Sequence, residues 1–144
     1  MGRQRKAKYM LHVMLDLYGC SRHLLENEGF LRQVLEQYPT RIGMQKIGPV
    51  ELRYIKTSNP SDDGYSGFVI IATSHCSLHA WAPYGMVNLD IFSCEDFDVA
   101  SAIAFARHMF QTDDVEVHAV ERATRSPRVS SGSRVVSEGS RQEW

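Results

Sequence analysis

Apolar and polar residues alternate along several short stretches of the chain, which is the pattern that half-buried β-strands produce. Turn-forming residues separate these stretches, most clearly Asn59-Pro60 and Pro83-Tyr84-Gly85. The pattern therefore predicts that most of the chain forms β-strands. The pattern predicts strands over residues 9–18, 50–56, 66–73, 75–82, 86–92 and 115–121.

Two other segments repeat their apolar residues with the 3.6-residue period of a helix. The first begins after Ser21, a residue that can cap a helix, and runs towards Pro39, which we expect just beyond its end. Gly29 should bend or break this helix. The second covers residues 97–110. Strands in runs with two helices favour an α+β fold, in which helices pack on one face of a layered antiparallel sheet.

The two ends of the chain differ in composition from its middle. Residues 1–8 are basic, and residues 123–144 are rich in Ser, Arg and Gly with little that a core could bury. We therefore expect a basic arm at the start and a disordered tail at the end. Residues 9–122 are enough for a core of their own, so a single domain is expected there.

Charge and cysteine content exclude several classes of function. A formal net charge of -1 and a pI near 6.6 give no field that would attract nucleic acid or an anionic membrane. No apolar run approaches the roughly 18 residues that a membrane helix needs. Three cysteines without a C-x-x-C pair fit neither a disulfide framework nor a structural zinc site. We expect a cytoplasmic protein with no nucleic acid, no membrane and no metal.

Reactive side chains crowd the middle of the strand pattern, where the sequence reads Thr73-Ser74-His75-Cys76 and then His79. A serine or histidine in a strand is, on its own, more often a packed or hydrogen-bonded residue than a catalyst. The G-x-S-x-G signature of many hydrolases is absent. Cys94, taken alone, is equally well explained as a small buried hydrophobic residue.

Taken together, these residues resemble the hallmark of the bacterial and archaeal S-adenosylmethionine decarboxylases. That family carries S-G, then E-S-H-x-S-x-H followed by an aromatic residue, then a strand that ends D-x-F-x-C. This chain has Ser66-Gly67, then the segment 74–81, then Cys94, with the spacings of the family. The resemblance extends from about Tyr9 to Arg122 and so leaves out only the two ends.

The resemblance implies that the chain cuts its own backbone between Thr73 and Ser74. The Ser74 hydroxyl would attack the Thr73 carbonyl, and loss of the Ser74 α-proton would then release the upstream chain and leave a pyruvoyl group. His79 matches the proton acceptor of this processing, and Ser66 matches the serine that assists it. The pyruvoyl group, the implied cofactor, would form a Schiff base with the substrate amine and accept the electrons released with carbon dioxide. Cys94 matches the proton donor in turnover.

Strand geometry sets one condition for this chemistry. Residues 74 and 79 are an odd number of positions apart, so a regular strand would place their side chains on opposite faces. The chain must therefore turn, bulge or break near Thr73-Ser74 if both are to serve one site. A smooth strand through Ser74, with His79 on the far face, would count heavily against self-processing.

The chain departs from the family pattern at three positions. Thr73 replaces the glutamate before the cut; this residue supplies only the attacked carbonyl, so cleavage is allowed but is expected to be slow beside a β-branched side chain. Ala82-Pro83 replaces Pro-Glu, which removes the glutamate that typically holds the ribose hydroxyls. Pro60 stands where many members have an aromatic residue that stacks on adenine.

Asp62 and Asp63 follow Pro60 and have two interpretations. They fit a solvated turn, and they also fit a site that attracts a cationic side chain. Together with Trp81 they are the candidate substrate-binding residues. Three functions stay open: a pyruvoyl-dependent S-adenosylmethionine decarboxylase that feeds spermidine synthesis, an ornithine or arginine decarboxylase on the same scaffold, and an unprocessed regulatory or binding chain. Because family members work as dimers, we expect a homodimer or a dimer of processed heterodimers.

Overall fold

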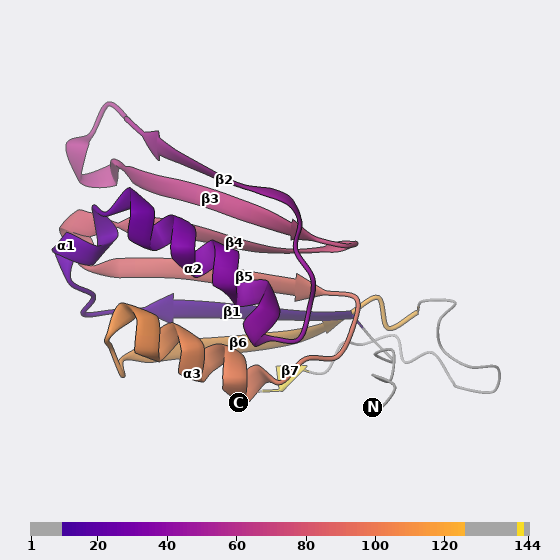
Figure 1. The fold of residues 1–144 in the computed structure, drawn as a ribbon. Helices are drawn as coiled ribbons and strands as arrows, with labels where there is room; N and C mark the ends of the chain where they lie inside the picture. Colours follow the sequence, from indigo (N-terminus) through magenta and orange to yellow (C-terminus); the bar gives the residue numbers. More distant parts are fainter. Residues whose placement is uncertain (1–9, 126–140, 143–144) are drawn as a thin grey trace.

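One antiparallel sheet, covered on one face by helices, forms the body of the molecule (Figure 1). The computed structural model describes residues 10–125 and 141–142. The strand order across the sheet is β2-β3-β4-β5-β1-β6-β7. The strands are β1 (Met10–Leu17), β2 (Ile47–Ile55), β3 (Gly64–Ile71), β4 (Ser74–Trp81), β5 (Met86–Ser93), β6 (Val115–Arg122) and β7 (Arg141–Gln142).

Every pairing between neighbouring strands is antiparallel, and β2 to β5 follow one another both in the sequence and in the sheet. Strand β1 lies between β5 and β6 and pairs with both, so the first strand of the chain is an inner strand of the sheet. This arrangement confirms the predicted α+β class with a layered antiparallel sheet. The predicted basic arm and most of the predicted disordered tail lie outside the described residues; residues 141–142 of that tail pair with β6.

The first predicted helix is two helices, α1 (Arg22–Leu25) and α2 (Glu28–Arg41). The break comes at Asn27, whose side chain accepts a hydrogen bond from the Phe30 amide and caps α2. The prediction that Pro39 lies beyond the helix was wrong, because α2 continues through it to Arg41. A proline in the last turn removes only one helical hydrogen bond, and the buried ring contributes to the core in return.

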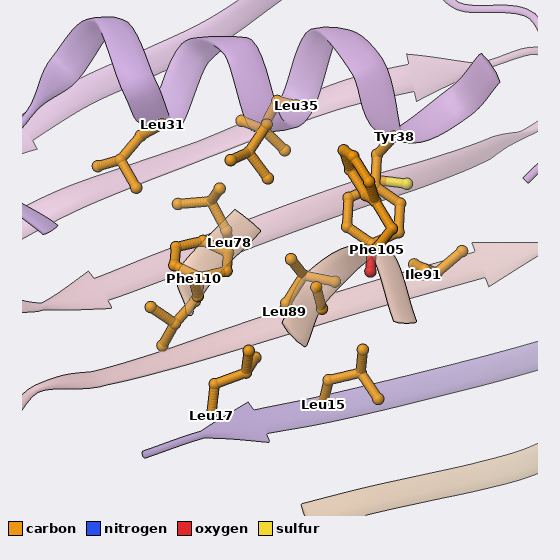
Figure 2. Close-up of a cluster of buried hydrophobic side chains, with 14 of the residues drawn as sticks. Leu15, Leu17, Leu31, Leu35, Tyr38, Leu78, Leu89, Ile91, Phe105 and Phe110 are labelled. Atoms are coloured by element: carbon orange, nitrogen blue, oxygen red, sulfur yellow. The ribbon is translucent and has the colours of Figure 1, made fainter. Parts of the chain in front are cut away.

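Helices α2 and α3 (Val99–Phe110) lie side by side over one face of the sheet (Figure 1). Alternate residues of each central strand point towards them and are fully buried, as the period of a strand requires. Figure 2 shows how the sheet and helix side chains interlock there. The core includes Leu15, Leu17, Leu78, Leu89 and Ile91 from the sheet, and Leu31, Leu35, Tyr38, Phe105 and Phe110 from the helices.

No described helix covers the other face of the sheet, which is called the open face below (Figure 1). It carries polar side chains and also large apolar ones, of which Ile47, Phe68 and Ile70 are 51%, 44% and 47% exposed. None of the described helices is both long enough and apolar enough to cross a membrane. The two faces of the sheet therefore differ in kind: one is a packed core, and the other is a mixed surface.

Candidate active site

Strands β3 and β4 are joined by a two-residue turn of Ala72 and Thr73, because Ile71 pairs directly with Ser74. Ala72 has a φ of 50°, in the left-handed region that tight hairpins usually fill with glycine. A side chain in this region costs about 1–2 kcal/mol. The strain lies next to the Thr73–Ser74 peptide bond, at which the family resemblance predicts cleavage.

The Ser74 side chain lies on the helix-covered face and is held by Cys94, which directly follows β5. The Cys94 amide donates a hydrogen bond of 3.0 Å to Ser74 Oγ, and Ser74 Oγ lies 3.4 Å from Cys94 Sγ. Thr73 Oγ1 lies 3.0 Å from the same sulfur. Ser74 and Cys94 are only 6% and 8% exposed. These three residues are called the Ser74 cluster below.

Ser66 and His79 form a second group, on the open face. They are directly opposite each other in the pairing of β3 with β4, and Ser66 Oγ lies 2.7 Å from His79 Nδ1. His79 is exposed and Ser66 is half-buried. These two candidate residues are therefore hydrogen-bonded to each other, and they are called the Ser66–His79 pair below.

The two groups are not brought together within one chain. The turn comes directly before Ser74, as the sequence condition requires, but β4 is regular from Ser74 to Trp81 and its burial alternates strictly. Five residues at about 3.3 Å each separate the Cα atoms of Ser74 and His79 by about 16 Å, and their side chains lie on opposite faces. His79 thus cannot take a proton from Ser74 of the same chain in this conformation. That finding weighs against processing by a single copy.

Two adjoining hollows lie on the open face around the Ser66–His79 pair. One, of about 520 Å³, runs over β2, β3 and β4 and is bordered by Arg53 and Phe68; the other, of about 420 Å³, is bordered by Asp62 and Trp81. The Ser66–His79 pair lines both hollows. Their sizes fall in the range of small-molecule sites, roughly 300–1,000 Å³.

A family model described as S-adenosylmethionine decarboxylase matches residues 11–123. The chain belongs to this family. The match begins one residue into β1 and covers the elements from there to β6, including α1, α2, α3 and both groups of candidate residues, which confirms the resemblance seen in the sequence.

Individual relatives agree with this assignment. A protein named "S-adenosylmethionine decarboxylase proenzyme" from Archaeoglobus fulgidus is 40% identical over 85 residues, which cover 59% of this chain and 70% of that protein. A protein of the same name from Moorella thermoacetica is 27% identical over 117 residues, which cover 81% of this chain and 89% of that protein. A crystal structure of the adenosylmethionine decarboxylase from Aquifex aeolicus has the same fold, with a TM-score of 0.65 at 22% identity over 79% of this chain and 90% of that one.

The two loop aspartates predicted near the substrate have different surroundings. Asp62 borders the smaller hollow together with Trp81. Asp63 instead accepts hydrogen bonds from the Thr57 amide at 2.7 Å and from Thr57 Oγ1 at 3.1 Å, so its carboxylate fixes the loop. The family's glutamate position is occupied by Ala82-Pro83 in a single 3₁₀ turn, and this turn offers no carboxylate to a ribose.

Some site residues were not identified from the sequence. Asn88 of β5 accepts a hydrogen bond from Trp81 Nε1 and donates one to Asp16, both at 2.7 Å, so it fixes the indole at the edge of the hollow. Gly67 has a packing reason in addition to its place in the family pattern, because a Cβ there would lie 2.7 Å from the Glu51 carbonyl oxygen. Strand alternation could have placed Asn88 on the open face, but only the β4–β5 register brings it to Trp81.

The other reactive residues of the crowded segment are packing residues. Cys76 is completely buried, and this burial raises the pKa of its thiol to about 12. His75 stacks at a tilt on Phe92, with ring centroids 5.7 Å apart, on the open face. The reactive residues of this segment thus divide between the Ser74 cluster, the Ser66–His79 pair and two packed side chains.

Proposed function

We propose that this chain is a self-cleaving, pyruvoyl-dependent decarboxylase that acts on S-adenosylmethionine and supplies aminopropyl groups for spermidine synthesis. The observation that carries the proposal is the position of Ser74: directly after a strained two-residue turn, with its hydroxyl held by the Cys94 amide. Membership in the family and the word "proenzyme" in the names of its relatives support a precursor that is processed.

The residues around Ser74 fit a pyruvoyl group at that position. Ser74 is small and buried, and conversion of its side chain and nitrogen into a keto acyl group adds no bulk to the packed turn. When present, the ketone supplies the electron sink for loss of carbon dioxide from a substrate bound through its amine. Cys94 lies beside the position and is the proton donor that we propose for turnover. A reducing cytoplasm, the proposed setting, keeps this thiol reduced.

A second copy of the chain resolves the separation of the two groups of residues. The Ser66–His79 pair lies on a face that no described helix covers and that exposes Phe68 and Ile70, so this face is suited to association. In the proposed homodimer, the pair of one copy approaches the Ala72-Thr73 turn at the end of β4 of the other copy, next to the bond to be cut. Processing of both copies then gives a dimer of processed heterodimers.

The smaller hollow is the proposed substrate site, and in the homodimer it serves the Ser74 position of the other copy, because Ser74 of the same chain lies on the opposite face of the sheet. The Trp81 ring and the Asp62 carboxylate both favour a cation, and S-adenosylmethionine carries a sulfonium and an ammonium group. The same features favour a second candidate, an ornithine or arginine decarboxylase, because Ala82-Pro83 leaves the ribose without a carboxylate while Asp62 remains. Release of carbon dioxide from S-adenosylmethionine, ornithine and arginine should be compared on the purified protein. Activity on the amino acids alone would contradict the first proposal.

Intact-mass spectrometry tests the cleavage itself. The proposal predicts two products, residues 1–73 and residues 74–144, the second with a blocked N-terminus. A single full-length mass after prolonged incubation would favour the third possibility, an uncut regulatory or binding chain.

A further inference from the structure

The hydroxyl group of Ser74 makes two contacts with one residue. Its oxygen accepts a hydrogen bond from the Cys94 amide at 3.0 Å, and it donates to Cys94 Sγ at 3.4 Å. The first contact fixes the oxygen, so the second directs the hydroxyl proton towards the sulfur. Both side chains are more than nine-tenths buried, which limits competition from water. The sulfur of Cys94 is thus the described acceptor for the proton that Ser74 must lose.

His79 does not occupy that position in the uncut chain. It lies on the open face, bonded to Ser66, and is about 16 Å from Ser74 along β4. A histidine from a second copy could approach the scissile bond, but the first proton to be removed already points at Cys94. The structure therefore separates two proton transfers that the sequence pattern gave to a single histidine.

We propose that Cys94 is a catalytic residue of self-cleavage, in which it takes the Ser74 hydroxyl proton as the ester forms. This inference rests on the proposed function. The Cys94 thiolate accepts the proton from Ser74 Oγ while Oγ bonds to the Thr73 carbonyl carbon. The bond between that carbon and the Ser74 nitrogen then breaks, and Cys94 returns the proton to this nitrogen, which becomes an amine. The thiolate is regenerated, and no oxidant or other reactant is consumed.

Thr73 is a positioning residue for the same step. Its hydroxyl lies 3.0 Å from Cys94 Sγ, and either atom can be the donor of this contact; with the hydroxyl as donor, the hydrogen bond stabilises the thiolate. Thr73, which stands where the family has a glutamate, thus contributes its hydroxyl to the proposed step. A thiol gives up its proton far more readily than a serine hydroxyl does, so the sulfur can serve as the acceptor where a hydroxyl in its place could not.

The test follows the cutting of freshly synthesised full-length chains over time, with and without hydroxylamine, which cleaves esters but not amides under mild conditions. The unmodified chain is compared with Cys94→Ala, Cys94→Ser and His79→Ala. Cys94→Ser keeps a hydrogen-bonding group of similar shape but removes the proton acceptor. Ser74→Ala, which cannot form the ester, is the uncut reference, and circular dichroism and gel filtration compare the fold of each variant with it.

Both Cys94 variants are expected to cut at least ten-fold more slowly than the unmodified chain, and hydroxylamine should not accelerate them. His79→Ala should instead accumulate the ester and be cut when hydroxylamine is added. Thr73→Val should slow ester formation while Thr73→Ser preserves it, since only the serine keeps the hydroxyl.

Cys94 variants that cut at the rate of the unmodified chain, or that hydroxylamine cuts as fast as His79→Ala, would overturn the inference and leave the proposed function standing. A fully active Cys94→Ser variant would overturn it as well, because a hydrogen bond alone would then suffice. An unmodified chain that never cuts and yields nothing to hydroxylamine would overturn the proposed self-cleavage and this inference with it.

Discussion

One group of reactive side chains lies near each end of strand β4, and the two groups differ in burial, in the face of the sheet they occupy and in the backbone that holds them. The Ser74 cluster is buried, lies on the helix-covered face and depends on a strained turn. The Ser66–His79 pair lies on the open face, borders two hollows and depends only on the regular pairing of β3 with β4. The difference fits the proposed division of roles, in which one group prepares the Thr73–Ser74 bond for cleavage and the other faces the space where a substrate or a second copy would enter.

The largest effect is expected from Ser74→Ala, which removes the only group of the Ser74 cluster that can form the ester. Cleavage between residues 73 and 74 should be abolished, and decarboxylation with it. Ser77→Ala is the matched control, because Ser77 lies on the same strand but on the opposite face and should leave cutting unchanged. Intact-mass spectrometry after incubation measures both. Normal cutting of Ser74→Ala at the same bond would show that the two ends of β4 were assigned the wrong roles.

The next prediction tests whether the two groups meet between copies. His79→Ala keeps an intact Ser74 cluster, and Ser74→Ala keeps an intact Ser66–His79 pair. If the pair of one copy serves the cluster of the other, mixing the two variants should restore cutting of the His79→Ala chain by at least ten-fold over that chain alone.

Different affinity tags on the two variants identify which chain is cut, and gel filtration confirms that they associate. Association without any cutting of the His79→Ala chain would contradict the shared site. The same mixture made with a chain that carries both substitutions is the control, because it associates but contributes no histidine.

Sequence alone located most strands, since each needs only local alternation of apolar and polar residues. The family pattern also singled out Ser66 and His79 individually, but their hydrogen bond comes from the pairing of β3 with β4. Strand parity alone could state only that Ser74 and His79 would lie on opposite faces of a regular strand. The left-handed turn at Ala72 could not be predicted, because alanine is not a residue that marks such a turn. The contacts of Cys94 with Ser74 depend on the β4–β5 register, which no local pattern encodes. The break at Asn27 and the buried ring of Pro39 depend likewise on how α2 packs.

Two aspartates of the loop between β2 and β3 are expected to give smaller effects, one on substrate binding and the other on folding stability. Asp62→Asn should raise KM for a cationic substrate about five-fold and leave kcat within about two-fold, because Asp62 borders the hollow but contacts neither group of reacting residues. Asp63→Asn is the matched variant. It weakens the two hydrogen bonds from Thr57 and should cost about 1 kcal/mol of folding stability.

Steady-state kinetics and thermal unfolding of both variants test this contrast. The melting temperature of Asp63→Asn should fall by about 3–5 °C, while that of Asp62→Asn stays close to the unmodified value. A large loss of kcat in Asp62→Asn would place this carboxylate in the reaction itself. Equal effects of the two variants on KM would show that the loop acts as a unit.

The smallest expected effect concerns the strain beside the scissile bond. Glycine at position 72 would relieve about 1–2 kcal/mol of left-handed strain but would cost about 0.4–1 kcal/mol through the flexibility it gives the unfolded chain. Ala72→Gly should therefore stabilise the uncut chain by about 0.5–1 kcal/mol, measured by denaturant unfolding in a Ser74→Ala background. With Ser74 present, it should slow cutting about two- to five-fold, because part of the energy stored next to the bond is lost.

Ala123 provides the matched control for this last substitution. It has a φ of 54°, nearly that of Ala72, but follows β6 and is far from Ser74 in the sequence. Ala123→Gly should give a similar gain in stability and no change in the rate of cutting. If both variants stabilise equally and both cut at the normal rate, strain at the turn contributes nothing to cleavage. The reactivity of the Ser74 cluster would then come from the contacts of Ser74 with Cys94 alone.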